Sequence, residues 1–125
     1  MTRAASEIVS GASAMAMTFR LRRMIARIWK GAVRAHDADE YTTYIRETGI
    51  AEYLQTPGNR GAWMLRRDDG DRTEFITYSL WDSLDAIRGF AGDDIEAAVY
   101  YPEDERFLIE QDDRVRHYEI VAGPE

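Results

Sequence analysis

The chain has 125 residues, of which 45% are hydrophobic, a formal net charge of −7 and no cysteine. This length fits one domain, and the negative charge disfavours nucleic acid and anionic membranes as partners. The lack of cysteine excludes disulfides and thiolate metal sites, and no apolar run approaches the roughly 20 residues that span a bilayer.

The first 34 residues are basic, with seven basic side chains and one acidic one, while the rest of the chain is acidic. A basic leader can bind an acidic partner, but residues 1–23 are more simply interpreted as a disordered or loosely attached segment. Glu7 interrupts the apolar stretch that a secretory signal needs. We therefore predict a cytoplasmic protein whose folded domain spans residues 24–122, followed by a tail at 123–125.

The first half of the domain predicts a strand followed by a helix. Residues 24–33 are rich in Ile, Val and Trp, which favour a strand. Asp37 or Asp39 can cap a helix from about residue 37 to 54, and the Thr-Pro-Gly-Asn sequence at 56–59 indicates a turn.

The second half predicts two strands, a helix and a last strand. Asp-Gly at 69–70 supplies the positive φ that a hairpin turn requires, and Ser83 is a suitable N-cap. The expected elements are strands at 59–67 and 72–81, a helix at 84–90 with a short helical piece over 95–98, a polar connection at 102–110 and a strand at 114–121.

This β-α-β-β-α-β order predicts an α+β, ferredoxin-like fold, with an antiparallel four-stranded sheet and both helices on one face. The strands nevertheless carry large apolar groups on both faces, such as Trp63 with Leu65 and Ala62 with Met64, where a solvated face would alternate to polar. An uncovered face would be a large apolar patch, so we predict a homodimer with the sheets packed face to face.

With this element order, the Ser-Leu-Trp-Asp-Ser sequence at 79–83 and the His-Tyr-Glu-Ile-Val sequence at 117–121 resemble the antibiotic biosynthesis monooxygenase family. The resemblance extends over about residues 24–121 and implies a dimeric α/β barrel. It implies a pocket between the sheet and the helices of each subunit. The family includes cofactor-independent oxygenases of polyketide aromatics and haem-degrading enzymes.

His117 is the candidate catalytic residue, because a histidine titrates near neutral pH and can move protons or bind haem iron. Packing beside the dimer interface would equally account for its place in an apolar strand. His36, at a strand-to-helix turn, is expected to face solvent. No metal site is predicted, and the acidic run at 93–96 and 103–105 is interpreted as a solvated face because it lacks metal-ligand spacing.

The candidate substrate-binding residues are aromatic groups that could hold a flat molecule and polar groups that could contact its oxygen. Tyr44 is preferred to Tyr41 because its neighbours are expected to face inward. Arg27, in the middle of a strand, needs an anionic partner, which could be Glu119, Glu74 or the substrate. The full set is Trp63, Trp81, Tyr44, Arg27, Asn59, Phe90 and Tyr101.

Three functions remain open. The first is a cofactor-independent monooxygenase acting on an aromatic or polyketide-type molecule in a hydrophobic pocket, with His117 as base or donor. The second is haem binding or degradation, although the haem-degrading relatives place an asparagine on the first strand, where this chain has Arg27 or its neighbours. The third is a non-enzymatic dimer that binds a small hydrophobic molecule.

Overall fold

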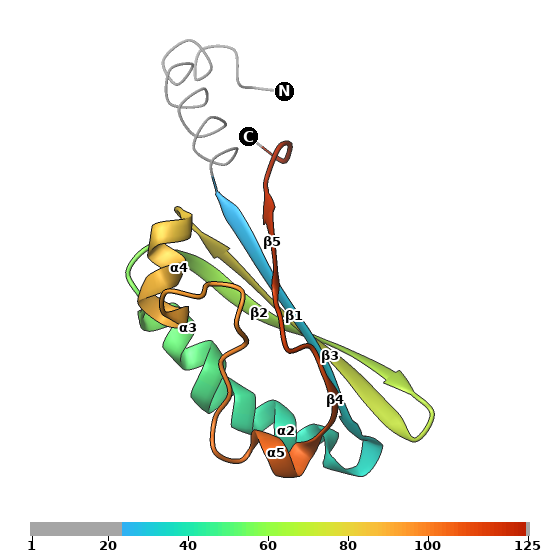
Figure 1. Cartoon of the computed structure of the whole chain (residues 1–125). Coiled ribbons are helices and arrows are strands. Elements are labelled where there is room, and N and C mark those ends of the chain that lie inside the picture. Colours follow the sequence, from blue (N-terminus) through green and yellow to red (C-terminus); the bar gives the residue numbers. More distant parts are fainter. Residues whose placement is uncertain (1–23, 125) are drawn as a thin grey trace.

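The structure, a computed structural model, describes residues 24–124 (Figure 1). The predictions for the leader 1–23 and for the last residue of the tail lie outside these residues. No helix within the described part is long and apolar enough to cross a membrane. The elements are β1 (Ile25–Arg34), η1 (Ala35–Asp37), α2 (Ala38–Ile45), η2 (Arg46–Ile50), α3 (Ala51–Gln55), β2 (Asn59–Asp69), β3 (Arg72–Trp81), α4 (Leu84–Ala91), α5 (Asp104–Phe107), β4 (Leu108–Gln111) and β5 (Arg116–Glu119).

The sheet is antiparallel in the order β2-β3-β1-β4, with β5 also paired to β1. β4 and β5 pair with opposite ends of β1, so five strands fill the four positions of the predicted ferredoxin-like sheet. The α+β fold is confirmed. The prediction of one last strand at 114–121 is corrected, because β4 and α5 form within the segment expected to be a polar connection.

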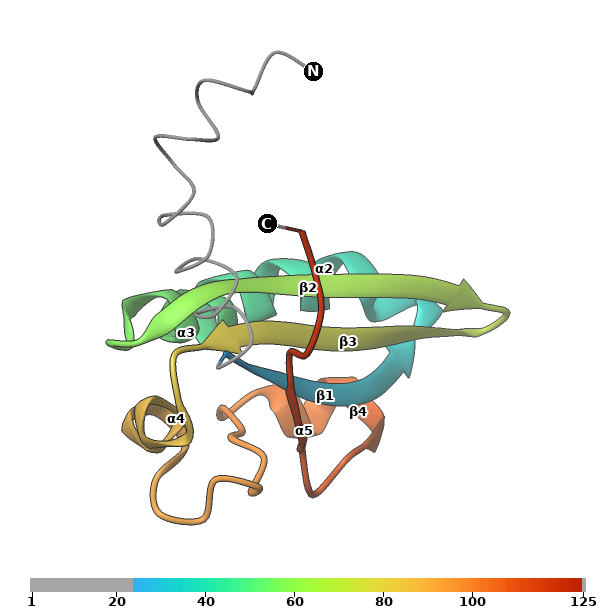
Figure 2. The ribbon, with the colours of Figure 1, turned by 90° about the horizontal axis from the view of Figure 1, so that it is seen from above.

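The first helical segment runs without a break from η1 to α3, close to the predicted 37–54. It lies along β2 (Figures 1 and 2). Gly49 lies in the π-helical turn η2 of this segment. The second helix begins and ends as predicted, since Ser83 Oγ accepts a hydrogen bond from the Ala86 amide and Gly92 ends α4 with φ 86°.

Alternation along β3 separates the two faces of the sheet. Every second residue from Thr73 to Trp81 is buried against the helices, while the residues between them are half-buried. Two apolar clusters fill the inner face, one around Tyr41 and Phe75 and the other around Trp81 and Ile87. Within residues 24–124, the helices therefore cover one face of the sheet only.

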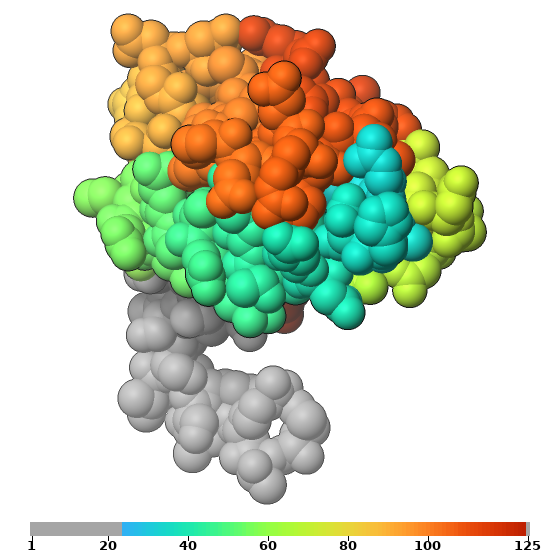
Figure 3. Space-filling view, turned by 90° about the horizontal axis from the view of Figure 1, so that it is seen from below, coloured from blue at the N-terminus to red at the C-terminus, as the bar shows by residue number. Residues whose placement is uncertain are grey.

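The connection between α4 and α5 is irregular, and the short helix expected over 95–98 does not form. Instead, Ala97 makes an isolated bridge with Arg114, which ties the connection to the segment before β5. Figure 3 shows the connection, in orange, covering the molecule between α4 and the long helical segment. We call residues 92–103 the strap, because they close the space between sheet and helices.

Candidate functional site

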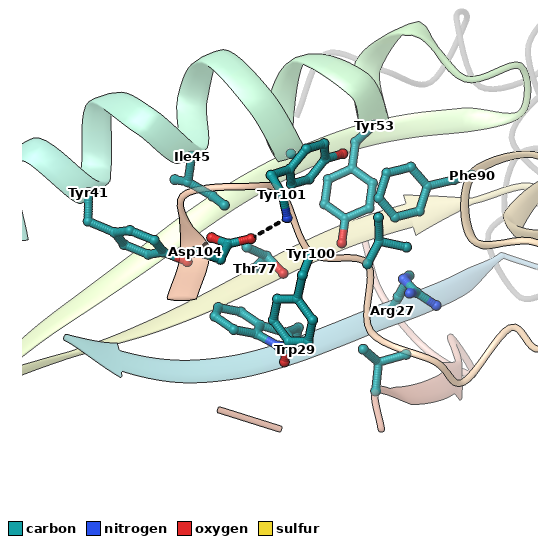
Figure 4. A pocket seen from close by; sticks show the side chains of 13 residues that line it. Arg27, Trp29, Tyr41, Ile45, Tyr53, Thr77, Phe90, Tyr100, Tyr101 and Asp104 are labelled. Carbon is teal, nitrogen blue, oxygen red and sulfur yellow. Dashed lines mark hydrogen bonds between the residues drawn. The ribbon is translucent and has the colours of Figure 1, made fainter. Parts of the chain in front are cut away.

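A pocket lies between the inner face of the sheet, the long helical segment and the strap (Figure 4). Its wall contains six aromatic residues, one arginine and one aspartate. The lining residues are Arg27, Trp29, Tyr41, Ile45, Gly49, Tyr53, Thr77, Phe90, Val99, Tyr100, Tyr101, Asp104 and Val115.

The pocket is narrow. Its empty volume is about 380 Å³ when the open mouth is included, but the centre of a water-sized sphere can reach only about 30 Å³. A cavity must give the centre of such a sphere roughly 10–15 Å³ to hold one buried water. The interior therefore has room for about two waters, and an aromatic ring requires the surrounding side chains to move.

Arg27 is the basic group of the pocket and is 1% exposed. Its Nη1 donates to the Ile95 carbonyl at 2.5 Å, and its Nη2 to the Ala97 carbonyl at 3.1 Å. Its guanidinium also lies 5.6 Å from the centre of the Phe90 ring. Nε is buried and has no hydrogen-bond partner within residues 24–124.

The predicted internal ion pair of Arg27 is not formed. Glu74 bonds Arg67 instead, and Glu119 is exposed on β5. The hydrogen bonds of Arg27 to other described residues all go to neutral groups, two carbonyls and one imidazole. Burying a cation without an anion is costly, so this arrangement favours a negatively charged ligand.

His117 lies on β5 directly opposite Arg27 on β1. The Nη1 of Arg27 and the Nε2 of His117 are 2.9 Å apart. Because arginine is always a donor, Nε2 must be the acceptor, and Nδ1 carries the proton in the neutral ring. Burial, followed by the charge of Arg27, lowers the pKa of His117. His117 does not line the pocket, because the Arg27 side chain lies between the imidazole and the pocket.

Asp104 is the second polar group of the lining, and it is 4% exposed. The prediction that its acidic run is a solvated face is wrong at this residue. One carboxylate oxygen accepts from the Tyr101 amide at 2.6 Å and the other from the Tyr41 hydroxyl at 3.4 Å. Burial raises the pKa of Asp104, and it also raises that of Tyr41, with the charge of Asp104 as a second cause.

The strap is fastened over the pocket by two tyrosines. The Tyr100 hydroxyl donates to the Asp112 carbonyl at 2.5 Å and accepts from Trp29 Nε1 at 3.1 Å. The Tyr101 hydroxyl donates to Glu52 on α3, and burial together with this bond raises the pKa of Tyr101. One tyrosine thus bonds toward the sheet and the other toward the helices.

Of the predicted substrate-binding residues, Arg27, Phe90 and Tyr101 line the pocket. Trp81 is fully buried behind them, in contact with Tyr53 and Phe90.

The remaining predicted residues lie elsewhere. Trp63 is 49% exposed on the other face of the sheet, beside Tyr78. Tyr44 packs on Phe107 outside the pocket and accepts a hydrogen bond from the Glu103 amide. Asn59 bonds both backbone groups of Gly61 at a bulge in β2.

Sequence reasoning missed Asp104 and chose Tyr44 over Tyr41. Trp29 is absent from the predicted set, although it lines the pocket and lies on the same face of β1 as Arg27, two residues away. That spacing was a usable signal, because side chains two apart in a strand point to the same side. For Asp104, an acidic residue within a charged run, the sequence offered no signal.

The described residues do not form a haem or metal site. Within residues 24–124 there is no group of three or more histidines and acidic residues that could hold a metal ion. An axial haem ligand needs a free imidazole nitrogen facing a large cavity, whereas His117 bonds Arg27 and does not reach a pocket of about 30 Å³. The residues present therefore do not fit haem.

The fold is shared with solved structures of low sequence identity. A proposed antibiotic biosynthesis monooxygenase from Bacillus cereus matches with a TM-score of 0.58 and 14% identity, over 82% of this chain and 98% of that one. A conserved protein from Methanosarcina mazei Go1 matches at 0.56 and 18%, over 81% and 96%. A proposed antibiotic biosynthesis monooxygenase from Chloroflexus aurantiacus J-10-fl matches at 0.51 and 17%, over 82% and 97%.

No family model matches the sequence, and no curated protein matches it. The chain thus has the same ferredoxin-like fold as these two proposed antibiotic biosynthesis monooxygenases, and the predicted resemblance is confirmed at the level of the fold. At identities of 14 to 18%, the reaction has to be argued from the pocket itself.

Proposed function

We propose that this protein binds a small aromatic molecule with an anionic oxygen in the pocket of Arg27 and promotes its reaction with dioxygen without a cofactor. The observation that carries the proposal is the burial of Arg27 without a carboxylate partner, in a wall of aromatic rings. A flat ligand would pack on Trp29, Tyr53 and Phe90, and its oxyanion would supply the missing negative charge.

An anthrone illustrates the reaction. Transfer of a proton from its CH₂ group to a water molecule at the pocket mouth gives an anion whose charge is shared between that carbon and the carbonyl oxygen on the opposite side of the ring. The carbon then combines with dioxygen, the resulting peroxide takes up the proton, and loss of water from it leaves a second carbonyl group. Arg27 would stabilise the oxygen-centred charge, which favours loss of the proton. The aromatic walls would keep water from the anion.

In this proposal His117 positions Arg27 and does not act as the base that the sequence suggested. The imidazole accepts from the guanidinium, so the Nε2 lone pair is not free to take a proton from a ligand. A neutral His117 also avoids placing a second positive charge beside Arg27. The lowered pKa of His117 supports this role.

Entry of an aromatic ligand requires the strap to move, because the interior has room for about two waters. The side chains that would have to shift are those of Val99, Tyr100 and Tyr101. Tyr100 and Tyr101 can replace their hydrogen bonds to Asp112 and Glu52 with hydrogen bonds to water. Moving the strap therefore requires little free energy from these bonds. The proposed ligand would thus bind by displacing the strap.

We also propose that the protein is a homodimer joined through the helix-free face of the sheet. That face carries Trp63 and Leu65, which are 49% and 50% exposed, and Tyr118, which is 50% exposed. Ile76 and Tyr78 on β3 are paired with Leu65 and Trp63 and extend the same surface. A patch of this kind usually marks an interface.

Oxygen uptake with a panel of anthrones and hydroquinones tests the reaction, and calorimetric titration with benzoate tests the pocket. We expect uptake that depends on protein concentration and is lost in Arg27→Gln. Binding without any oxygen uptake would favour the alternative of a non-enzymatic binding protein. Absence of both would contradict the proposal.

A further inference from the structure

We infer that Asp104 is a second ligand-binding group of the pocket, which accepts a hydrogen bond from a hydroxyl group on the aromatic ligand. The inference rests on the proposed function, because it concerns the same pocket, and it specifies the substrate class. The ligand would carry an anionic oxygen at one end and a hydroxyl at the other.

The placement of the two charged groups supports a ligand with an anionic oxygen at one end and a hydroxyl group at the other. Arg27 comes from β1 and Asp104 from the start of α5, and both line the same pocket. Figure 4 shows them on opposite sides of Tyr100, with the aromatic wall between them. Neither forms an ion pair with the other, so each is free to meet a different end of a ligand.

The hydrogen bonds of Asp104 leave it room for another donor. A carboxylate has about four acceptor positions, and Asp104 uses two. The bond from the Tyr101 amide is short, at 2.6 Å, but the bond from the Tyr41 hydroxyl is long, at 3.4 Å. At that length the Tyr41 bond is weak, so a ligand hydroxyl can replace or supplement it.

The burial of Asp104 strengthens the preference of the pocket for a ligand that carries a hydroxyl group. Asp104 is 4% exposed, and the narrow pocket leaves little room for water to hydrogen-bond its carboxylate. A site built around a buried acceptor discriminates against a ligand that lacks the matching donor, because the acceptor is then left unpaired. A structural role of Asp104 in holding the Tyr101 turn would give no such discrimination.

The test measures affinities by calorimetric titration at pH 7.5 for benzoate, 3-hydroxybenzoate, 4-hydroxybenzoate and 4-methoxybenzoate. We expect at least one hydroxybenzoate to bind tenfold or more tightly than benzoate and the methoxy compound. Asp104→Asn keeps an acceptor for the Tyr101 amide but removes the charge. It should reduce this preference to threefold or less.

Glu105→Gln is the matched control, because Glu105 is an exposed acid in the same helix. It should leave all four affinities unchanged. Equal affinities of the unaltered protein for benzoate and both hydroxybenzoates would overturn the inference but leave the proposed function standing. This comparison needs no variant, so it does not depend on whether a variant folds. A hydroxyl preference that persists in Asp104→Asn would also overturn it. Failure of all four compounds to bind would overturn the inference and the proposed function together.

Discussion

Arg27 on β1 and His117 on β5 face each other across one pair of strands, with Nη1 and Nε2 2.9 Å apart. The buried cation is thus bonded to a neutral ring rather than to a carboxylate. Two strap carbonyls complete its partners. This arrangement holds a positive charge in a pocket lined by aromatic rings, and in our proposal the ligand supplies the opposite charge.

Replacing Arg27 by glutamine should weaken the binding of benzoate at least tenfold. A hydrogen bond to a charged group is worth about 1.5–3 kcal/mol, which corresponds to a factor of roughly 10–100. Calorimetric titration measures the change. Arg60→Gln, at an exposed arginine paired with Asp82, is the control and should bind benzoate normally. Equal affinity in both variants would show that Arg27 does not meet the anion.

The lowered pKa of His117 predicts a dependence of stability on pH. In the unfolded chain a histidine takes up its proton near pH 6.5, whereas the folded protein resists this until a lower pH. The free energy of unfolding should therefore fall as the pH drops from about 7 through 6.5 toward the folded pKa. His117→Gln, which keeps an acceptor for Arg27, should lose this component. Urea unfolding of both proteins at pH 7.5 and 5.0 measures it, and parallel changes in the two would contradict the prediction.

Leu65→Glu should separate the proposed dimer, because it places a charge in the middle of the helix-free sheet face. Sedimentation equilibrium at micromolar concentration should give a dimer for the unaltered protein and a monomer for the variant. Leu84→Glu changes an equally large leucine, 42% exposed on α4, and should remain dimeric. A monomer for the unaltered protein would rule out the interface.

Gly31→Ala should destabilise the protein and disturb the pocket. A Cβ atom at this position would lie 2.4 Å from Cη2 of Trp29 and 3.2 Å from the Glu110 carbonyl oxygen. Overpacking of this kind costs about 1–3 kcal/mol, and the displaced Trp29 ring would change the near-ultraviolet circular dichroism. Gly89→Ala is the contrast, since its Cβ would meet only Thr56 at 3.4 Å inside α4. It should leave stability unchanged or raise it by up to about 1 kcal/mol.

Much of the fold could be predicted because its signals are local. The bounds of β3 agree with the prediction, since the Asp-Gly turn and the run of β-forming residues define both ends. Ser83 began a helix because its hydroxyl bonds an amide three residues on. β4 could not be predicted in the same way, because Leu108–Gln111 has only four residues, two apolar and two polar, and becomes a strand by pairing with β1.

The site was less predictable, because a pocket joins residues that are far apart in the chain. Arg27 was recognised as an unusual buried charge, but its partners lie 68 to 90 residues away and could not be chosen from the sequence. Tyr41 and Tyr44 both lie on α2, and the small rotation that puts Tyr41 in the pocket depends on how the helix packs against β3 and α5.

The sequence by itself determined the order of the elements from β1 to α4, the α+β class and the apolar character of both sheet faces, because short-range periodicity, caps and turns encode these properties. The tertiary structure alone decided that Asp104 is buried, that Trp63 faces away from the pocket and that Arg27 meets His117 instead of a carboxylate. Burial and partner choice arise only when distant segments pack together, and no local pattern of residues records that packing.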